Sequence, residues 1–300
     1  MTSPLWRCEM VLTPKCNFHC IYCRGLRKEF SKTIPFDDAV KILELWCSMG
    51  LKNVRFSGGE PTLYGNLERL VKYCESNKVE RIAVSTNGSA DWQAYQRLID
   101  AGVNDFSVSL DSCCASTGDK IAGGINGSWL KVIENIGRMA KKVYTTVGVV
   151  INEENVEQCL DTVIFADTLG VSDIRVIPSA QYNRLLEVLQ NIPEEILSKH
   201  PILKYRVNNI RSGRNIRGLT NKDSKHCWLA MDDMAVAGNY HFPCIIWLRE
   251  QGDPIGRVGP NIRKERYDWV IKHDCFKDPI CRKNCLDVCK DYSNKVAGSR

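Results

Sequence analysis

The sequence predicts an α/β fold, a partial (β/α)6 barrel followed by a small Cys-rich α+β domain, and three observations point to it. Short apolar runs alternate with amphipathic helical stretches six times between residues 7 and 178. The alternation stops after residue 178, and six of the fifteen cysteines follow position 226. Six β/α units imply a parallel sheet but are too few to close an eight-stranded barrel. We therefore expect domains at 1–180 and 181–300.

The elements of the first domain follow from the hydrophobic periodicity. The predicted strands cover residues 9–12, 53–56, 81–85, 105–109, 145–151 and 173–177. The predicted helices cover residues 36–49, 67–77, 91–101, 128–141 and 155–169. Asp91 and Asn155 are residue types that favour N-caps, and Gly50, Gly102 and Gly170 follow helix ends. The carboxyl ends of parallel strands gather at one edge, where we expect the active site.

The second domain begins with helical stretches and ends with cysteines. Residues 185–190 and 193–199 have helical patterns, and the basic stretch 204–225 is expected to be an exposed linker rather than a phosphate-binding patch. A Gly238-Asn239 turn between residues 234–237 and 240–242 predicts a β-hairpin.

Composition excludes several classes of protein. The 300 residues are 44% hydrophobic and 25% charged, as in ordinary globular chains, and the net charge of +6 is modest. No apolar run approaches the ~18 residues of a membrane span, and the first fifteen residues lack a signal-peptide core. We therefore expect a cytoplasmic protein without a membrane partner. In a reducing cytosol so many cysteines favour metal binding or catalysis over disulfides.

Cys16, Cys20 and Cys23 form a C-x3-C-x2-C run. Thiolates are the soft ligands of iron–sulfur clusters, and a cubane of four irons normally takes four. Three cysteines therefore leave one iron open, which is typical of catalytic metal sites. A zinc site is the alternative, although zinc prefers paired C-x2-C ligands and a closed shell of four.

The run, including Tyr22 before its third cysteine, resembles the cluster motif of the radical S-adenosylmethionine (SAM) superfamily. The stretch Gly58-Gly59-Glu60-Pro61, after the second predicted strand, resembles the GGEP motif that holds the methionyl amino group of SAM in that superfamily. Two glycines allow a ligand to approach the backbone closely, and a carboxylate can accept a hydrogen bond from an ammonium group. A tight turn is the alternative interpretation of this motif.

The resemblance implies further SAM contacts at the strand ends. These are Ser85, Asn87, Ser109, Asp111, Asn152 and Ile177. Ser109 and Asp111 share one face of an extended chain, although serine and asparagine at strand ends are usually turn formers. The implied chemistry is reductive cleavage of SAM at a [4Fe–4S] cluster, giving a 5′-deoxyadenosyl radical that abstracts hydrogen from a substrate. A flavodoxin-like or ferredoxin-like partner would supply the electron. No catalytic residue is assigned beyond the cluster, with Cys113 and Cys114 as weaker candidates.

The C-terminal cysteines resemble the SPASM and twitch domains that carry auxiliary [4Fe–4S] clusters in this superfamily. The six are Cys227, Cys244, Cys275, Cys281, Cys285 and Cys289. The match is partial, because five residues rather than four follow Gly238 before the next cysteine, and position 272 is lysine where a cysteine is expected. Two complete clusters would need eight thiolates. We expect one auxiliary cluster, with two clusters that have open irons, or zinc, as alternatives.

The predicted function is that of a radical SAM oxidoreductase, isomerase or lyase. Its auxiliary cluster would accept an electron or bind the substrate. Fifteen residues before Cys16 leave no room for a leader-binding domain, which favours a small-molecule, nucleotide or partner-delivered substrate. A peptide-modifying SPASM maturase is the alternative. A remote one is a non-catalytic metal-binding protein that contacts nucleic acid through residues 204–225.

Overall fold

The computed structural model describes residues 7–298, and the chain forms two compact units. Unit 1 comprises Met1–Lys15, Arg24–Ile82 and Arg217–Arg300, and unit 2 comprises Cys16–Cys23 and Ala83–Ile216. The predicted domain boundary near residue 180 stays a prediction, because compactness alone does not show which parts fold separately. Among the described residues, no helix has both the length and the apolar character needed to cross a membrane.

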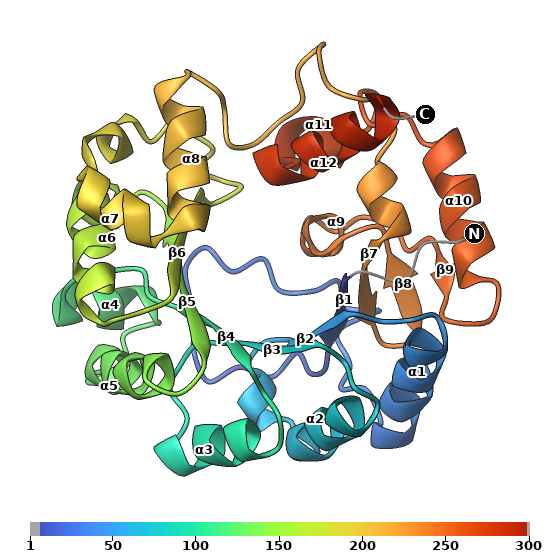
Figure 1. The fold of residues 1–300 in the computed structure, drawn as a ribbon, viewed down its shortest axis with the longest axis horizontal. Helices are drawn as coiled ribbons and strands as arrows, with labels where there is room; N and C mark the ends of the chain where they lie inside the picture. The colour runs from blue at the N-terminus through green and yellow to red at the C-terminus, as the bar shows by residue number, and fades with distance from the viewer. Residues whose placement is uncertain (1–6, 299–300) are drawn as a thin grey trace. The chain divides into compact units, whose positions relative to one another are not determined.

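Unit 1 is organised around strand β1, which lies between β2 and β7 (Figure 1). The strand order is β2-β1-β7-β8-β9, in which β1 is parallel to both neighbours and β8 is antiparallel to β7 and β9. Its strands are β1 (Arg7–Val11), β2 (Asn53–Ser57), β7 (Asp233–Ala237), β8 (Tyr240–Phe242) and β9 (Gly256–Arg257). Its helices are α1 (Phe36–Ser48), η1 (Pro61–Leu63), α2 (Leu67–Ser76), η4 (Trp228–Met231), α9 (Ile245–Arg249), α10 (Ile262–Lys272), α11 (Pro279–Asn284) and α12 (Asp287–Gly298).

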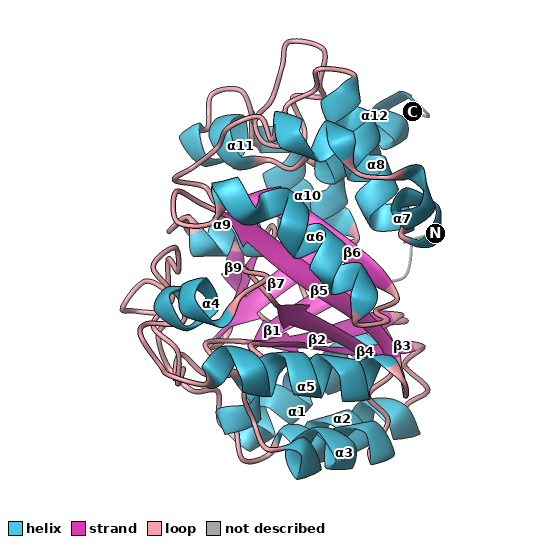
Figure 2. Ribbon diagram, turned by 90° about the vertical axis from the view of Figure 1, so that its left-hand side faces the viewer, coloured by secondary structure: helices cyan, strands magenta, loops and turns pink. Residues whose placement is uncertain are grey.

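Unit 2 contains the parallel strands β3 to β6. They are β3 (Arg81–Thr86), whose residues from Ala83 onwards lie in this unit, β4 (Asp105–Ser109), β5 (Tyr144–Ile151) and β6 (Asp173–Pro178). The helices are α3 (Trp92–Asp100), α4 (Ala115–Ile121), α5 (Ser128–Ala140), η2 (Val156–Gln158), α6 (Cys159–Thr168), η3 (Glu187–Asn191), α7 (Glu194–Lys199) and α8 (Pro201–Arg211). Helices α5 and α6 pack against β5, and α8 packs against β6. Figure 2 shows β4, β5 and β6 side by side as a twisted layer. The predicted α/β class and the parallel strands are confirmed.

The two faces of the unit 2 strands differ in polarity. One face is apolar and buried, and consists of Val84, Phe106, Val108, Val147, Val149, Ile174 and Val176. On the other face Ser85, Ser107 and Thr146 form one row across the strands, and Ser109, Gly148 and Arg175 form the next. Side chains alternate between faces along a strand, so the serines and the arginine share one surface. A polar face beside an apolar one suits a sheet that binds a polar ligand on one side.

The predicted hairpin is confirmed, but it does not belong to a separate sheet. Strands β7 and β8 pair around Gly238, whose φ of 59° is the left-handed conformation that glycine adopts readily. Strand β7 also pairs in parallel with β1, so that Cys8 is opposite Met234 and Met10 is opposite Val236. The Cys-rich segment therefore extends the strand layer of β1. This pairing supplies hydrogen-bond partners for the backbone N–H and C=O groups along the edge of β1 that faces away from β2.

Arg266 on α10 forms hydrogen bonds with the backbone in and next to this hairpin. Its side chain is fully buried, and its guanidinium donates to the carbonyl oxygens of Ala230 (2.6 Å), Phe242 (2.9 Å), Pro243 (3.1 Å) and Asp233. A planar group with five donors satisfies several carbonyls at once. The backbone at Pro243, next to Cys244, and at Ala230, three residues after Cys227, is thereby fixed.

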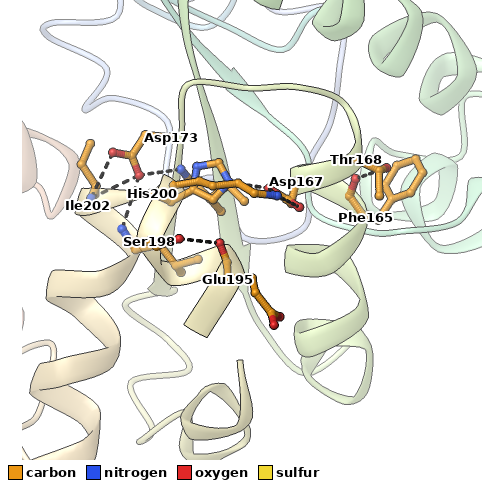
Figure 3. A network of polar contacts seen from close by, with 11 residues as sticks. Phe165, Asp167, Thr168, Asp173, Glu195, Ser198, His200 and Ile202 are labelled. Atoms are coloured by element: carbon orange, nitrogen blue, oxygen red, sulfur yellow. Dashed lines mark hydrogen bonds and ion pairs between the residues drawn. The ribbon is translucent and has the colours of Figure 1, made fainter. Parts of the chain in front are cut away.

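Two predictions, one of a linker and one of a helix cap, need correction. Residues 204–211 are not an exposed linker, because α8 packs on β6 and buries Arg206. Figure 3 shows the reason: the carboxylate of Asp173 accepts hydrogen bonds from the backbone N–H groups of Ile202 (3.0 Å) and Leu203 (3.4 Å) and so caps the start of α8. The same network joins His200 Nε2 to Asp167 at 3.0 Å.

The second correction concerns Asn155, which does not cap a helix through its side chain. Its amide donates to the carbonyl oxygens of Asp111 (2.7 Å) and Val150 (3.0 Å), and the regular helix α6 begins only at Cys159. Asp91 does occupy the N-cap position of α3, but its side chain pairs with Lys131 at 2.6 Å rather than capping. The predicted C-terminal glycines have positive φ values of 77° at Gly50, 120° at Gly102 and 73° at Gly170.

Candidate functional site

The three-cysteine segment is an extended loop of unit 2 that the strand ends hold in place. The N–H of His19 donates to Ala122 O at 2.9 Å, and the N–H of Cys23 donates to Cys20 O at 2.9 Å, which closes a turn around the second and third cysteines. Gly123 must be glycine for His19 to lie there, since a Cβ at Gly123 would be 2.9 Å from the Cβ of His19. Backbone hydrogen bonds therefore fix the course of the chain through the three-cysteine segment.

Two asparagines join the loop to the end of β3. Asn87 donates to Asn17 Oδ1 at 2.9 Å, and Asn17 donates to Ser89 Oγ at 2.8 Å. The amide of Asn87 also lies 4.0 Å from the sulfur of Cys16, and the backbone N–H of Phe18 donates to that sulfur at 3.4 Å. N–H groups directed at a thiolate stabilise its negative charge, and such bonds help set the potential of an iron–sulfur cluster.

Tyr22 joins the loop to β4. Its hydroxyl donates to Asp111 Oδ2 at 2.5 Å, while the backbone N–H of Val150 donates to the other carboxylate oxygen at 2.8 Å. Burial raises the pKa of Asp111 to about 6, although both hydrogen bonds oppose that rise. Asp111 thus anchors the aromatic residue of the motif. Its predicted contact with SAM stays a prediction.

The donor set of the loop fits an iron–sulfur cluster. Cys16 and Cys23 are exposed and Cys20 is half-buried. Burial, together with the nearby Asp111, Cys23 and Cys16, raises the pKa of Cys20 to about 12. Without a bound cation the thiol form of Cys20 is favoured, and a bound iron would stabilise the thiolate. The residues present would hold such a cluster through three sulfurs.

The glycine motif lies in unit 1 and packs against the chain's own backbone. The N–H groups of Gly59 and Glu60 donate to Thr13 O and Lys15 O, both at 2.7 Å. A Cβ at Gly58 would lie 2.4 Å from Thr13 O, and one at Gly59 would lie 2.3 Å from Lys15 O. The glycines are therefore needed for close packing on residues 13–15, a reason that differs from the predicted approach of a ligand.

Glu60 is fully buried. Its Oε1 accepts hydrogen bonds from the N–H of Thr62 at 3.1 Å and from the hydroxyl of Thr62 at 2.8 Å, so the side chain caps the turn η1 that starts at Pro61. A carboxylate fixed in this way is preorganised, which suits a group that receives an ammonium ion. Its role towards SAM stays a prediction.

The strand-end residues fall into two groups. Ser85, Ser109 and Ile177 lie on the polar face of unit 2, which is where a ligand of polar character would be accommodated. Asn152 is buried, and its Oδ1 accepts the N–H of Glu154 at 2.9 Å in a local turn. Ser85, Ser109 and Ile177 thus share one face of the strands. The side-chain oxygen of Asn152 instead accepts a backbone hydrogen bond.

Arg175 is a candidate that our sequence analysis did not identify. Its guanidinium lies on the polar face, 3.4 Å from the hydroxyl of Ser107 and against Gly148. A cation there would attract an anionic ligand group. The signal was present in the sequence, since Arg175 lies between apolar residues at the centre of the predicted strand 173–177.

Cys113 and Cys114 differ in reactivity. Burial raises the pKa of Cys113. The sulfur of Cys114 lies 3.5 Å from the hydroxyl oxygens of both Ser116 and Thr117, and its hydrogen bonds with these residues lower its pKa to about 6. Cys114 is therefore the more nucleophilic thiol of the pair.

The six C-terminal cysteines gather in unit 1. Cys275 is close enough to Cys281 for a side-chain hydrogen bond, as Cys285 is to Cys289, and both Cys281 and Cys285 are influenced by the charges of Cys227 and Cys244. None of the cysteines of the chain, all of which lie among the described residues, forms a disulfide. A cluster of this many thiols in one place fits bound metal, which withdraws charge from them.

The sequence matches a protein family and known enzymes over part of its length. The family model described as Radical SAM superfamily matches residues 10–166. The probable GTP 3′,8-cyclase of Methanococcus maripaludis is 34% identical over 120 residues, which cover 39% of this chain and 40% of that protein. The GTP 3′,8-cyclase of Clostridium botulinum is 26% identical over 198 residues, which cover 63% of this chain and 62% of that protein. The matched regions thus span less than two thirds of either relative.

Two solved structures share the fold. Streptococcus suis SuiB bound to its precursor peptide SuiA has a TM-score of 0.65 at 16% identity, over 94% of this chain and 66% of that one. The protein anSMEcpe with bound AdoMet has a TM-score of 0.66 at 15% identity, over 93% of this chain and 82% of that one.

Proposed function

The chain belongs to the radical SAM superfamily of enzymes, and we propose that it binds the [4Fe–4S] cluster of that family through Cys16, Cys20 and Cys23. When bound there and reduced, such a cluster would supply the electron for cleavage of SAM to methionine and a 5′-deoxyadenosyl radical, the species that would remove a hydrogen atom from the substrate. The observation that carries the proposal is the loop itself. Cys16 and Cys23 lie close enough to Cys20 to raise the pKa of its thiol, and N–H groups of Phe18 and Asn87 are directed at Cys16.

The protein's own contribution is binding and orientation. Tyr22 and Asp111 fix the loop, and the two N–H groups at Cys16 stabilise the thiolate form. In unit 1, the buried carboxylate of Glu60 is held by Thr62 as an acceptor for the methionyl ammonium group. On the polar face of unit 2, Ser85 and Ser109 offer hydroxyl groups to a polar ligand. An external flavodoxin-like or ferredoxin-like protein would supply electrons in the cytoplasm.

We propose a nucleotide or another small anionic molecule as the substrate. The curated relatives named above are GTP 3′,8-cyclases, so a purine nucleotide is the first candidate. Arg175 on the polar face of unit 2 offers a cation that suits a phosphate group. Peptide modification is the second candidate, because SuiB, which shares the fold, binds a precursor peptide.

The C-terminal cysteines would hold an auxiliary [4Fe–4S] cluster in unit 1. Such a cluster would either accept an electron from the substrate radical or bind the substrate through an open iron. Four thiolates would close the shell and favour electron transfer, whereas three would leave an iron open. The number of thiolates that bind it therefore separates the two roles.

The test is SAM cleavage by the anaerobically reconstituted full chain under dithionite. We expect 5′-deoxyadenosine from the unaltered protein and none from Cys20→Ala. Cys47→Ala, which removes a half-buried thiol of α1, is the matched control and should retain the activity. GTP should raise the yield above that without substrate, whereas stimulation only by peptides would favour the second candidate. Equal 5′-deoxyadenosine from Cys20→Ala would overturn the proposal.

A further inference from the structure

Three side chains of unit 1 bring their metal-binding atoms to one point. The Nε2 atom of His273 and the Sγ atoms of Cys275 and Cys281 all lie within 4.8 Å of one another, and His273 Nε2 is 3.8 Å from Cys281 Sγ. A tetrahedral zinc ion with bonds of about 2.3 Å to sulfur and about 2.1 Å to nitrogen separates such atoms by about 3.6 Å. We propose that these residues bind a single divalent ion of zinc type, separate from the auxiliary cluster. The proposal does not depend on the SAM reaction.

The imidazole of His273 is held in the orientation that ligation requires. Its ring stacks on the indole of Trp269, with centroids 4.2 Å apart and planes 14° apart. The ring of Trp247 packs against it edge to face, at 5.2 Å and 81°. Two large aromatic neighbours leave the ring little freedom, and Nε2 is directed at the sulfur of Cys281. Fixed ligand orientation of this kind strengthens metal binding.

The chain between the three residues is folded to bring them together. Helix α10 ends before His273, whose N–H donates to Trp269 O at 2.8 Å. Asp274 then closes a turn by accepting the N–H of Phe276 at 3.0 Å, and Asp278 caps α11 by accepting the N–H of Cys281 at 2.8 Å. Both carboxylates thus build the turn that returns Cys281 to His273.

The number of ligands favours a single ion at His273, Cys275 and Cys281 beside one cubane. Removing Cys275 and Cys281 from the tail leaves Cys227, Cys244, Cys285 and Cys289, which are the four thiolates that one complete cubane takes. His273 therefore explains how a segment with six cysteines can satisfy two metal centres.

The net charge of the ion with its three ligands also suits a partly buried site. Cys275 is buried, and two thiolates with a neutral imidazole exactly balance the double charge of the ion, so no net charge is buried. Among the described residues, no further His, Cys, Asp or Glu ligand atom completes the group. Three protein ligands with a fourth position open to water or a substrate group are typical of reactive rather than structural zinc sites.

The experiment measures zinc and iron in the full chain, purified anaerobically from zinc-supplemented cells. We expect about one zinc per chain in addition to the iron. His273→Ala should weaken zinc binding by at least about tenfold and leave the iron content unchanged. His226→Ala is the matched control, because His226 lies in the same segment but its Nδ1 contacts Val270 O at 2.8 Å. That variant should keep both metals.

A second measurement guards against loss of metal through misfolding. Cobalt(II) added to the zinc-free protein should give the intense visible bands of tetrahedral thiolate coordination, and His273→Cys, which supplies a third thiolate, should restore binding with shifted bands. The proposal is overturned if the unaltered protein binds no zinc, if His273→Ala retains zinc, or if His273→Ala loses iron instead. SAM cleavage, measured on the same samples, reports independently on the proposed function.

Discussion

Replacing Gly59 by alanine places a Cβ atom 2.3 Å from Lys15 O and 2.6 Å from Pro14 O. Ordinary van der Waals contact begins near 3.4 Å, so the backbone must separate by about 1 Å (3.4 minus 2.3). The separation would strain the hydrogen bonds from Gly59 to Thr13 and from Glu60 to Lys15, both 2.7 Å long. Gly59→Ala therefore perturbs the packing of the glycine motif on residues 13–15.

Two effects contribute to the loss of free energy of unfolding in Gly59→Ala. Overpacking costs about 1–3 kcal/mol, and weakening two buried hydrogen bonds adds about 1 kcal/mol. We expect the free energy of unfolding to fall by about 2–4 kcal/mol. Gly65→Ala is the matched control, since a Cβ there meets no atom within 4 Å, and it should change stability by less than about 1 kcal/mol.

The assay is urea unfolding of the cluster-free chain under anaerobic, reducing conditions. With a slope of about 3 kcal/mol per molar urea, Gly59→Ala should lower the midpoint by about 1 M. Equal midpoints for Gly59→Ala and Gly65→Ala would show that the glycine serves something other than packing on residues 13–15, and the reasoning would be wrong.

Three further predictions concern single residues. Tyr22→Phe removes a hydrogen bond to the buried Asp111 and should lower the free energy of unfolding by about 1–3 kcal/mol; an unchanged unfolding midpoint would contradict this. Burial and Arg266 lower the pKa of His241 to about 4 from 6.5. Between those pH values this histidine is protonated in the unfolded chain but not in the folded one. The free energy of unfolding should therefore fall on acidification by about 2–3 kcal/mol. His241→Gln should abolish that pH dependence, and an identical slope would refute the assignment. At pH 7 iodoacetamide should alkylate Cys114 first, because its pKa is about 6; peptide mapping that found preferential labelling elsewhere would count against it.

The alternating strands and helices were predictable because their signal is local. The hydrophobic periodicity placed the predicted strands within one or two residues of β1 to β6, since side-chain burial alternates along a strand. The three-cysteine run and the glycine motif also identified the superfamily to which the chain belongs, because their chemistry requires specific residue types at fixed spacing.

What the sequence could not indicate were interactions between distant segments. The parallel pairing of β7 with β1 joins residues more than 200 positions apart, and a strand pattern does not reveal its partner. The stretch 204–211 was misjudged as a linker because its charges outweighed its apolar residues. In the structure Val207 and Ile210, together with Leu203 just before the stretch, form a buried face of α8. His273 was overlooked because a histidine becomes a ligand candidate only when a fold places thiols beside it.

The most direct test of the account is the iron content of a variant in which Cys16, Cys20 and Cys23 are all alanine. The account predicts that this protein, after anaerobic reconstitution, retains about four irons per chain in the C-terminal segment and forms no 5′-deoxyadenosine from SAM. Loss of all iron would remove the auxiliary cluster from the account. Continued formation of 5′-deoxyadenosine would contradict the assignment of SAM chemistry to the three-cysteine segment.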